Sequence, residues 1–156
     1  MARMQSITAS ILVECSVEAV FAFVTDARNN LLWQSTSGLR ESRQLPESPV
    51  GVGTQVIEIW HVMGVRALVT SEVTAYEPGR CYTRHRLSGA CPITQRTQLF
   101  EPAANGTRWI SSLSIQAGGE YAIDETALAI EIEQALKANL AVAKTLLERR
   151  IVQNAH

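Results

Sequence analysis

The chain has no long apolar run, no excess of charge of one sign and few cysteines. No stretch approaches the ~18 apolar residues that a membrane-spanning helix needs, so we expect no membrane span. Acidic and basic residues nearly balance, at a net charge of -1, and they are mixed along the whole chain. This balance provides no broad positive field for a phosphate backbone or an anionic lipid surface. We therefore expect no nucleic-acid partner.

The cysteines do not form the pattern of a secreted protein. Cys15, Cys81 and Cys91 are odd in number and lie within predicted strands or at their edges, which argues against a disulfide framework. We expect three reduced thiols. The first residues also lack the apolar segment of a secretory leader. Together these features predict a cytoplasmic protein.

Signatures of metal and nucleotide chemistry are missing from the sequence as well. The histidines lack the helical spacing of a zinc pair, and no two cysteines form a Cys-x-x-Cys motif. The segment Gly51-Val52-Gly53-Thr54 has neither the lysine of a phosphate-binding loop nor the third glycine of a dinucleotide motif. No Gly-x-Ser-x-Gly nucleophile motif occurs. We expect neither a metal nor a cofactor.

Apolar residues make up 46% of the 156 residues. That content suits one ligand-binding domain over residues 1–156, burying roughly two thirds of its unfolded surface. Residues 7–15 alternate between apolar and polar types, which predicts a strand. Two short helices are predicted next, one beginning after the capping residue Ser16 and one between Asp26 and Trp33.

The rest of the chain divides into a meander of strands and a final helix. Between Leu39 and Ile115, alternating segments are separated by Pro, Gly and Asn turns such as Asn105-Gly106. Because the connections are short, consecutive strands should be antiparallel neighbours. A helix is predicted from a cap near Asp124 to about Arg150. The pattern indicates an α+β fold, with a curved antiparallel sheet of about six to seven strands around one long C-terminal helix.

We expect a hollow between that sheet and the helix. Five alanines lie between Ala127 and Ala141; they favour the helix but add little bulk to its inner face. A ligand-binding hollow should exceed ~300 Å³. The alternative is that bulky sheet residues, Trp60, Phe100 and Trp109, fill the gap.

Several local strings carry a family resemblance that extends from about Ile7 to Ile151. They are Ser16-Val17-Glu18-Ala19-Val20-Phe21-Ala22-Phe23-Val24-Thr25-Asp26 with Trp33 beyond it, Gly51-Val52-Gly53-Thr54, Glu72-Val73-Thr74-Ala75-Tyr76-Glu77-Pro78-Gly79, and Phe100-Glu101-Pro102 followed by Gly106-Thr107. In these strings the chain resembles the START-like, or SRPBCC, superfamily, and within it the polyketide cyclase/dehydrase and lipid-transport proteins. The resemblance implies a helix-grip fold whose cavity binds lipids, polyketides, aromatic hormones or other apolar molecules. In some members that cavity also catalyses aldol-type cyclisation or dehydration, and the fold alone does not choose between these roles.

Our leading hypothesis is that the chain binds a small hydrophobic or aromatic ligand, lipid-like or polyketide-like, between sheet and helix. Two alternatives stay open: a polyketide cyclase or dehydratase that uses the same cavity, and a protein-interaction domain that uses the outer face of the sheet. The residues predicted to contact the ligand are Trp33, Trp60, His85, Gln95, Trp109 and Ser111.

A cyclase needs a base and donors for an oxyanion, so the question is which polar side chains face inward. On the predicted strand 81–87, His85 belongs to the less charged face and becomes a candidate base. Its alternative is a structural histidine without catalytic importance. On the strand 107–115, Trp109 and Ser111 share one face. Trp109 could form a wall of the cavity and Ser111 could donate a hydrogen bond to the ligand, but ordinary core packing explains both equally well.

The facing of the strand 54–62 is ambiguous from sequence. Either Glu58 with Trp60 or His61 points into the hollow, because an ideal strand places them on opposite faces. A buried Glu58 would have a raised pKa and act as a base, but a solvated Glu58 is the favoured expectation because glutamate is rarely buried unpaired. Gln95 and Arg96 are opposed in the same way, and either could orient a carbonyl group.

Overall fold

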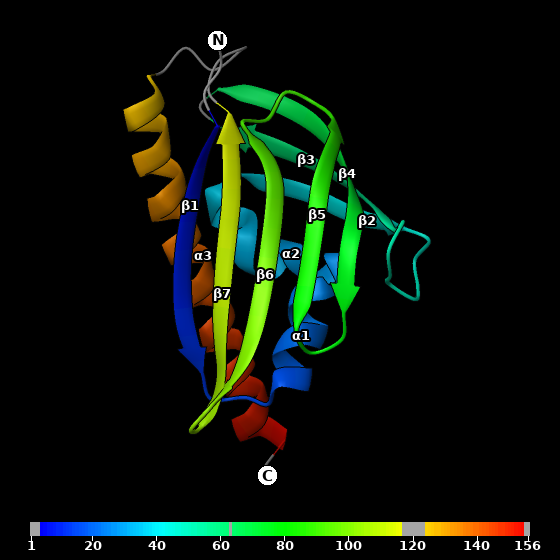
Figure 1. Ribbon diagram of the computed structural model, residues 1–156, viewed down its shortest axis with the longest axis vertical. Helices are drawn as coiled ribbons and strands as arrows, with labels where there is room; N and C mark the ends of the chain where they lie inside the picture. The colour runs from blue at the N-terminus through cyan, green and yellow to red at the C-terminus, as the bar shows by residue number, and fades with distance from the viewer. Residues whose placement is uncertain (1–3, 63, 117–123, 155–156) are drawn as a thin grey trace.

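The computed structural model describes residues 4–62, 64–116 and 124–154. Its main elements are a seven-stranded sheet and one long helix (Figure 1). The strands are β1 (Met4–Val13), β2 (Leu39–Leu45), β3 (Gln55–Val62), β4 (Val65–Glu77), β5 (Cys81–Ser88), β6 (Ile93–Ala103) and β7 (Gly106–Gln116). The predicted strand number and the α+β class are confirmed.

The sheet order is β1-β7-β6-β5-β4-β3-β2, and every neighbouring pair is antiparallel. Strands β2 to β7 form the predicted meander, since each pairs with the next one along the chain. The first strand then pairs with the last, so that Met4 lies opposite Gln116 and Val13 opposite Thr107. This pairing leaves β1 and β2 as the two edges of the sheet.

The helical elements are α1 (Val17–Thr25), η1 (Ala27–Asn29), α2 (Asn30–Gln34), η2 (Ser35–Ser37) and α3 (Glu125–Asn154). The predicted caps are present. The Ser16 hydroxyl accepts a hydrogen bond from the Ala19 amide at 3.2 Å, and the Asp124 carboxylate accepts one from the Ala127 amide at 2.9 Å. These side chains satisfy amides that have no partner within the first turn of a helix. None of the described helices is long and apolar enough to cross a bilayer.

Helix α3 lies across one face of the sheet. Figure 1 shows it running behind β1 and β7, with α1 and α2 on the same side of the sheet. Its C-terminal half contributes buried Leu140, Ala143 and Leu147 to the main core. The helix-grip fold implied by the resemblance is therefore the observed one.

An aromatic cluster fills the core where α1 and α2 meet the sheet. The Trp109 ring lies 6.3 Å from the stacked Phe100 ring and 5.3 Å from the Trp33 ring, which meets it edge-on. The Trp109 Nε1 donates a hydrogen bond to the Gln98 Oε1 at 2.7 Å. This end of the space between the layers is solid, so any hollow must lie toward the other end of α3.

Candidate functional site

A cavity of about 530 Å³ lies between the sheet and the N-terminal half of α3. It exceeds the volume expected for a ligand site, and the alternative of a filled interior is wrong for this half of the molecule. The lining residues come from the η2–β2 junction, β3, the start of β6, β7 and α3: Thr36, Ser37, Gly38, Arg40, Trp60, His61, Val62, Cys91, Pro92, Ile93, Arg96, Leu113, Leu128, Glu131, Ile132, Gln134, Ala135, Leu136 and Asn139.

Most of the inner wall is apolar. Leu113 of β7 faces Leu128, Ile132 and Leu136 of α3 across the cavity space, and Ala135 is one of the small helix residues predicted to leave that space open. Exposed polar side chains stand at the rim, namely Arg40, His61, Glu131 and Gln134. The arrangement suits a mostly apolar molecule that enters from a polar opening.

Arg96 is the charged side chain on the inner wall. Its guanidinium carbon lies 5.3 Å from the centre of the Trp60 ring, a cation–π arrangement. Among the described residues, no carboxylate lies within 4.0 Å of it, and its side chain has no hydrogen-bond partner. Burial and the like charge of Arg84 lower the pKa of Arg96, against the attraction of Glu58. An arginine nevertheless stays protonated in a protein.

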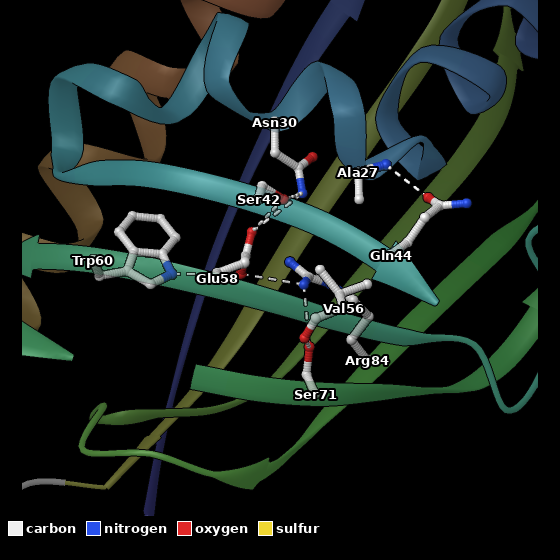
Figure 2. A network of polar contacts seen from close by, with 9 residues as sticks. All are labelled: Ala27, Asn30, Ser42, Gln44, Val56, Glu58, Trp60, Ser71 and Arg84. Carbon is white, nitrogen blue, oxygen red and sulfur yellow. Dashed lines mark hydrogen bonds and ion pairs between the residues drawn. The ribbon is translucent and has the colours of Figure 1, made fainter. Parts of the chain in front are cut away.

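Beside the cavity lies a buried polar network centred on Glu58 (Figure 2). The Glu58 Oε1 accepts hydrogen bonds from Arg84 Nη1 at 3.3 Å and from Trp60 Nε1 at 3.4 Å. The Oε2 accepts from Asn30 Nδ2 at 3.2 Å and from Ser42 Oγ at 3.3 Å. Donors from α2, β2, β3 and β5 therefore occupy both carboxylate oxygens, and the network joins four elements at one point.

The charges and hydrogen bonds of this network determine the protonation states of Glu58 and Arg84. Burial by itself raises the pKa of Glu58, but the charges of Arg84 and Arg96 and the hydrogen bonds from Arg84 and Trp60 hold that pKa below its ordinary value. Burial lowers the pKa of Arg84, and the attraction of Glu58 outweighs it and raises that pKa. Glu58 is therefore an ionised structural carboxylate, which is a poor base at neutral pH.

The ambiguous facing of β3 is resolved by burial. Glu58 and Trp60 point inward, with exposed fractions of 3% and 7%, whereas His61 is exposed at the rim. The favoured expectation of a solvated Glu58 is wrong, because Arg84 supplies a buried partner from two strands away. The raised pKa expected for a buried Glu58 is wrong for the same reason.

The predicted facing of β5 is also wrong. His85 and Leu87 are exposed, whereas Tyr82 and Arg84 are buried. The prediction chose the less charged face, but the Glu58 carboxylate neutralises Arg84 inside, and the Tyr82 ring packs in the main core. His85 consequently does not line the cavity, so this candidate base cannot reach a ligand bound there.

The other predicted contact residues fall into three places. Trp60 lines the cavity, and Gln95 lines only a small cleft beside it. Trp33, Trp109 and Ser111 are buried in the core and do not line the cavity. The shared inward face of Trp109 and Ser111 is confirmed, but ligand contact by any of these residues stays a prediction.

Sequence reasoning underrated Arg96 and overlooked Asn139. On β6, Arg96 lies on the same face as the buried residues Gln98 and Phe100, so the apolar Phe100 indicates that this face points inward. Asn139 projects from α3 to the cavity wall, where its Nδ2 donates to the Ser37 Oγ at 3.0 Å. Because asparagine is polar, the sequence pattern did not assign Asn139 to the face of α3 that points toward the sheet. No group of three or more potential metal ligands occurs within the described ranges.

Comparison with known proteins gives a consistent result. A family model described as polyketide cyclase / dehydrase and lipid transport matches residues 4–148. No curated protein matches the sequence. Among solved structures, the Zhui aromatase/cyclase from Streptomyces sp. R1128 has a TM-score of 0.75 at 16% identity, covering 96% of each chain.

Two further structures show how widely this fold is shared. The di-domain aromatase/cyclase StfQ from the steffimycin biosynthetic pathway has a TM-score of 0.71 at 13% identity, covering 95% of this chain and 52% of the other. Ara h 8.0201 has a TM-score of 0.67 at 11% identity, covering 93% of this chain and 98% of the other. Likeness at these identities establishes the shared fold alone.

Proposed function

We propose, from the premise that this chain belongs to the polyketide cyclase / dehydrase and lipid transport family, that it binds a small apolar or aromatic molecule between the sheet and α3. The observation that carries the proposal is the cavity of about 530 Å³ with leucine and isoleucine walls. Its volume lies within the roughly 300–1,000 Å³ of small-molecule sites.

The physical cost of such a space supports the same function. Protein interiors pack densely, and an unfilled apolar cavity forfeits dispersion contacts along its whole wall. The aromatic cluster beyond the cavity shows that this chain can pack its interior tightly. A binding role accounts for a hollow that core packing alone would eliminate.

A cyclase or dehydratase in the same cavity has fewer observations behind it. The Zhui aromatase/cyclase shares the fold, and His61 places an imidazole at the cavity rim. Glu58 is ionised and fully hydrogen-bonded, and His85 lies outside the cavity. We therefore propose binding as the primary function and catalysis as a second candidate, in which His61 would act as the base.

Native mass spectrometry and tryptophan fluorescence test the proposed binding. The chain is titrated with a panel of fatty acids, fatty alcohols and polycyclic aromatic ketones. We expect saturable one-to-one complexes and a change in the emission of Trp60, which lines the cavity. The variant Trp60→Phe should bind but lose most of the spectral change. Failure of every compound to form a complex would contradict the proposal.

A further inference from the structure

Arg96 brings a positive charge to the wall of a mostly apolar cavity, and among the described residues no carboxylate forms an ion pair with it. Its guanidinium touches the face of Trp60, and the described residues offer it no carboxylate within 4.0 Å and no side-chain hydrogen bond. The Arg96 side chain is half-buried, and withdrawing part of a guanidinium from water without a paired anion costs free energy. The cavity is the side from which such a partner can arrive.

The neighbouring charges do not supply that partner. Both oxygens of the Glu58 carboxylate are occupied by other donors, and the buried Arg84 lies beside that carboxylate as a second cation. The Cys91 thiol also lines the cavity, but burial raises its pKa, so it stays protonated. Two guanidinium groups against one carboxylate leave one surplus positive charge. Glu131, the acidic residue of the cavity lining, is exposed at the rim.

We propose that the ligand is an apolar carboxylic acid whose carboxylate pairs with Arg96 while its aliphatic or aromatic body packs against Leu113, Leu128 and Ile132. This inference rests on the proposed binding function and specifies its ligand class. A guanidinium donates two parallel hydrogen bonds to a carboxylate. In a water-poor cavity the attraction between the opposite charges is also much stronger than in water.

The count of charges favours a carboxylate over other polar head groups. An alcohol or ketone accepts a hydrogen bond but leaves the surplus charge in place. A phosphomonoester carries about two negative charges at neutral pH, one more than Arg96 neutralises. Hydrogen bonds to charged groups contribute about 1.5–3 kcal/mol, which corresponds to roughly a ten- to hundred-fold preference for an acid over the matching alcohol.

Isothermal titration calorimetry at neutral pH tests this preference with matched probes. The intact protein is titrated with decanoic acid and decanol, and separately with naphthoic acid and naphthalenemethanol. The acid of each pair should bind about ten- to hundred-fold tighter than its alcohol. Equal binding within each pair would overturn the inference and leave the proposed function standing. Failure of all acids and alcohols to bind would contradict the proposed function itself.

Substitutions assign the preference to Arg96. In Arg96→Met the acid should lose its advantage while the alcohol still binds, and Arg96→Lys should keep part of it. The control is Arg108→Met, which removes an exposed arginine from β7 outside the cavity and should leave the preference intact. A preference that survives Arg96→Met would overturn the assignment, since it would have to come from a rim residue such as Arg40.

Thermal unfolding supplies a second readout that does not depend on affinity. Without ligand, Arg96→Met should melt no lower than the wild type, because it removes a half-buried charge that has no carboxylate partner among the described residues. Decanoic acid should raise the melting temperature of the wild type but not that of the variant. A large loss of stability in the ligand-free variant would show that Arg96 is a structural cation and would overturn the inference. Should the variant not fold, the acid and alcohol comparison on the wild type still decides.

Discussion

At the scale of the residue, Glu58 shows how the surroundings of a side chain override its usual preference for water. A glutamate without partners in an apolar interior would be protonated and neutral, because burial raises its pKa. Here Arg84, Trp60, Asn30 and Ser42 donate to its two oxygens. The carboxylate thereby holds α2, β2, β3 and β5 together beneath the cavity. Its role in this structure is to position other residues, including the Trp60 ring of the cavity wall.

Replacing Glu58 with glutamine should destabilise the protein severely. The substitution keeps the shape of the side chain but leaves the buried Arg84 without its carboxylate partner, and breaking a buried pair costs about 3–5 kcal/mol. Urea unfolding measures the loss. The control Glu101→Gln removes an exposed carboxylate from β6 and should change stability by less than about 0.5 kcal/mol. Equal effects of the two substitutions would show that the buried network contributes nothing specific.

Gly38 is a second residue whose identity follows from its surroundings. It has a φ of 114°, and a Cβ atom there would lie 2.3 Å from the His61 carbonyl oxygen. We expect Gly38→Ala to cost at least about 1–3 kcal/mol in unfolding free energy. Gly53→Ala, at a φ of 94° with nothing within 4 Å, has the backbone strain without the clash and should cost less. A Gly38→Ala protein as stable as Gly53→Ala would contradict the importance of this close approach.

At the scale of the element, α3 is fastened to the end of β1 by a pair of charged side chains. The Lys144 Nζ donates to the Leu12 carbonyl oxygen and to the Glu148 carboxylate, both at 2.7 Å. The Glu148 carboxylate also accepts from the Glu14 amide at 2.9 Å. Because β1 is an edge strand, these contacts fix the C-terminal half of the helix, while its N-terminal half borders the cavity.

This contact predicts a specific dependence of stability on pH. Burial alone raises the pKa of Glu148, but the hydrogen bonds from Lys144 and the Glu14 amide outweigh burial and lower that pKa below the ordinary 4.5. A lowered pKa in the folded state stabilises the fold above pH 4.5, and this contribution is lost as the pH falls through the folded-state pKa. In urea unfolding, the difference between the wild type and Glu148→Gln should therefore shrink below pH 4.5. A difference that stays constant with pH would show that the Glu148 charge is not involved.

The elements also show where sequence reasoning succeeds. Apolar alternation, turn residues and caps are local signals, so Ser16, Asp124 and the meander were predicted correctly. The facing of β5 was not, because a buried arginine is stable only where another strand supplies its carboxylate. The pairing of Arg84 with Glu58 spans β3 and β5, with β4 between them. No pattern within a single strand contains that information.

At the scale of the whole molecule, the two halves of α3 perform different tasks. The C-terminal half packs against the sheet through Leu140, Ala143 and Leu147, and the N-terminal half leaves a cavity of about 530 Å³. The alanines on the helix predicted such a space. Which residues line it depends on how far the sheet curves away from the helix, so the expected contacts Trp33 and Trp109 lie in the packed half instead.

A substitution that fills the cavity should separate binding from folding. Ala135→Phe places a ring into the cavity from α3, where added apolar contacts commonly stabilise a protein by about 0.5–2 kcal/mol. We expect a melting temperature at or above that of the wild type and at least a tenfold loss of decanoic acid affinity by calorimetry, because the ring takes the space beside Ile132 where the aliphatic chain is proposed to pack. The control Ala138→Phe changes an exposed position of α3 outside the cavity and should bind as the wild type does. Undiminished binding in a folded Ala135→Phe protein would show that the ligand does not pack beside Ala135, as the proposed binding mode requires.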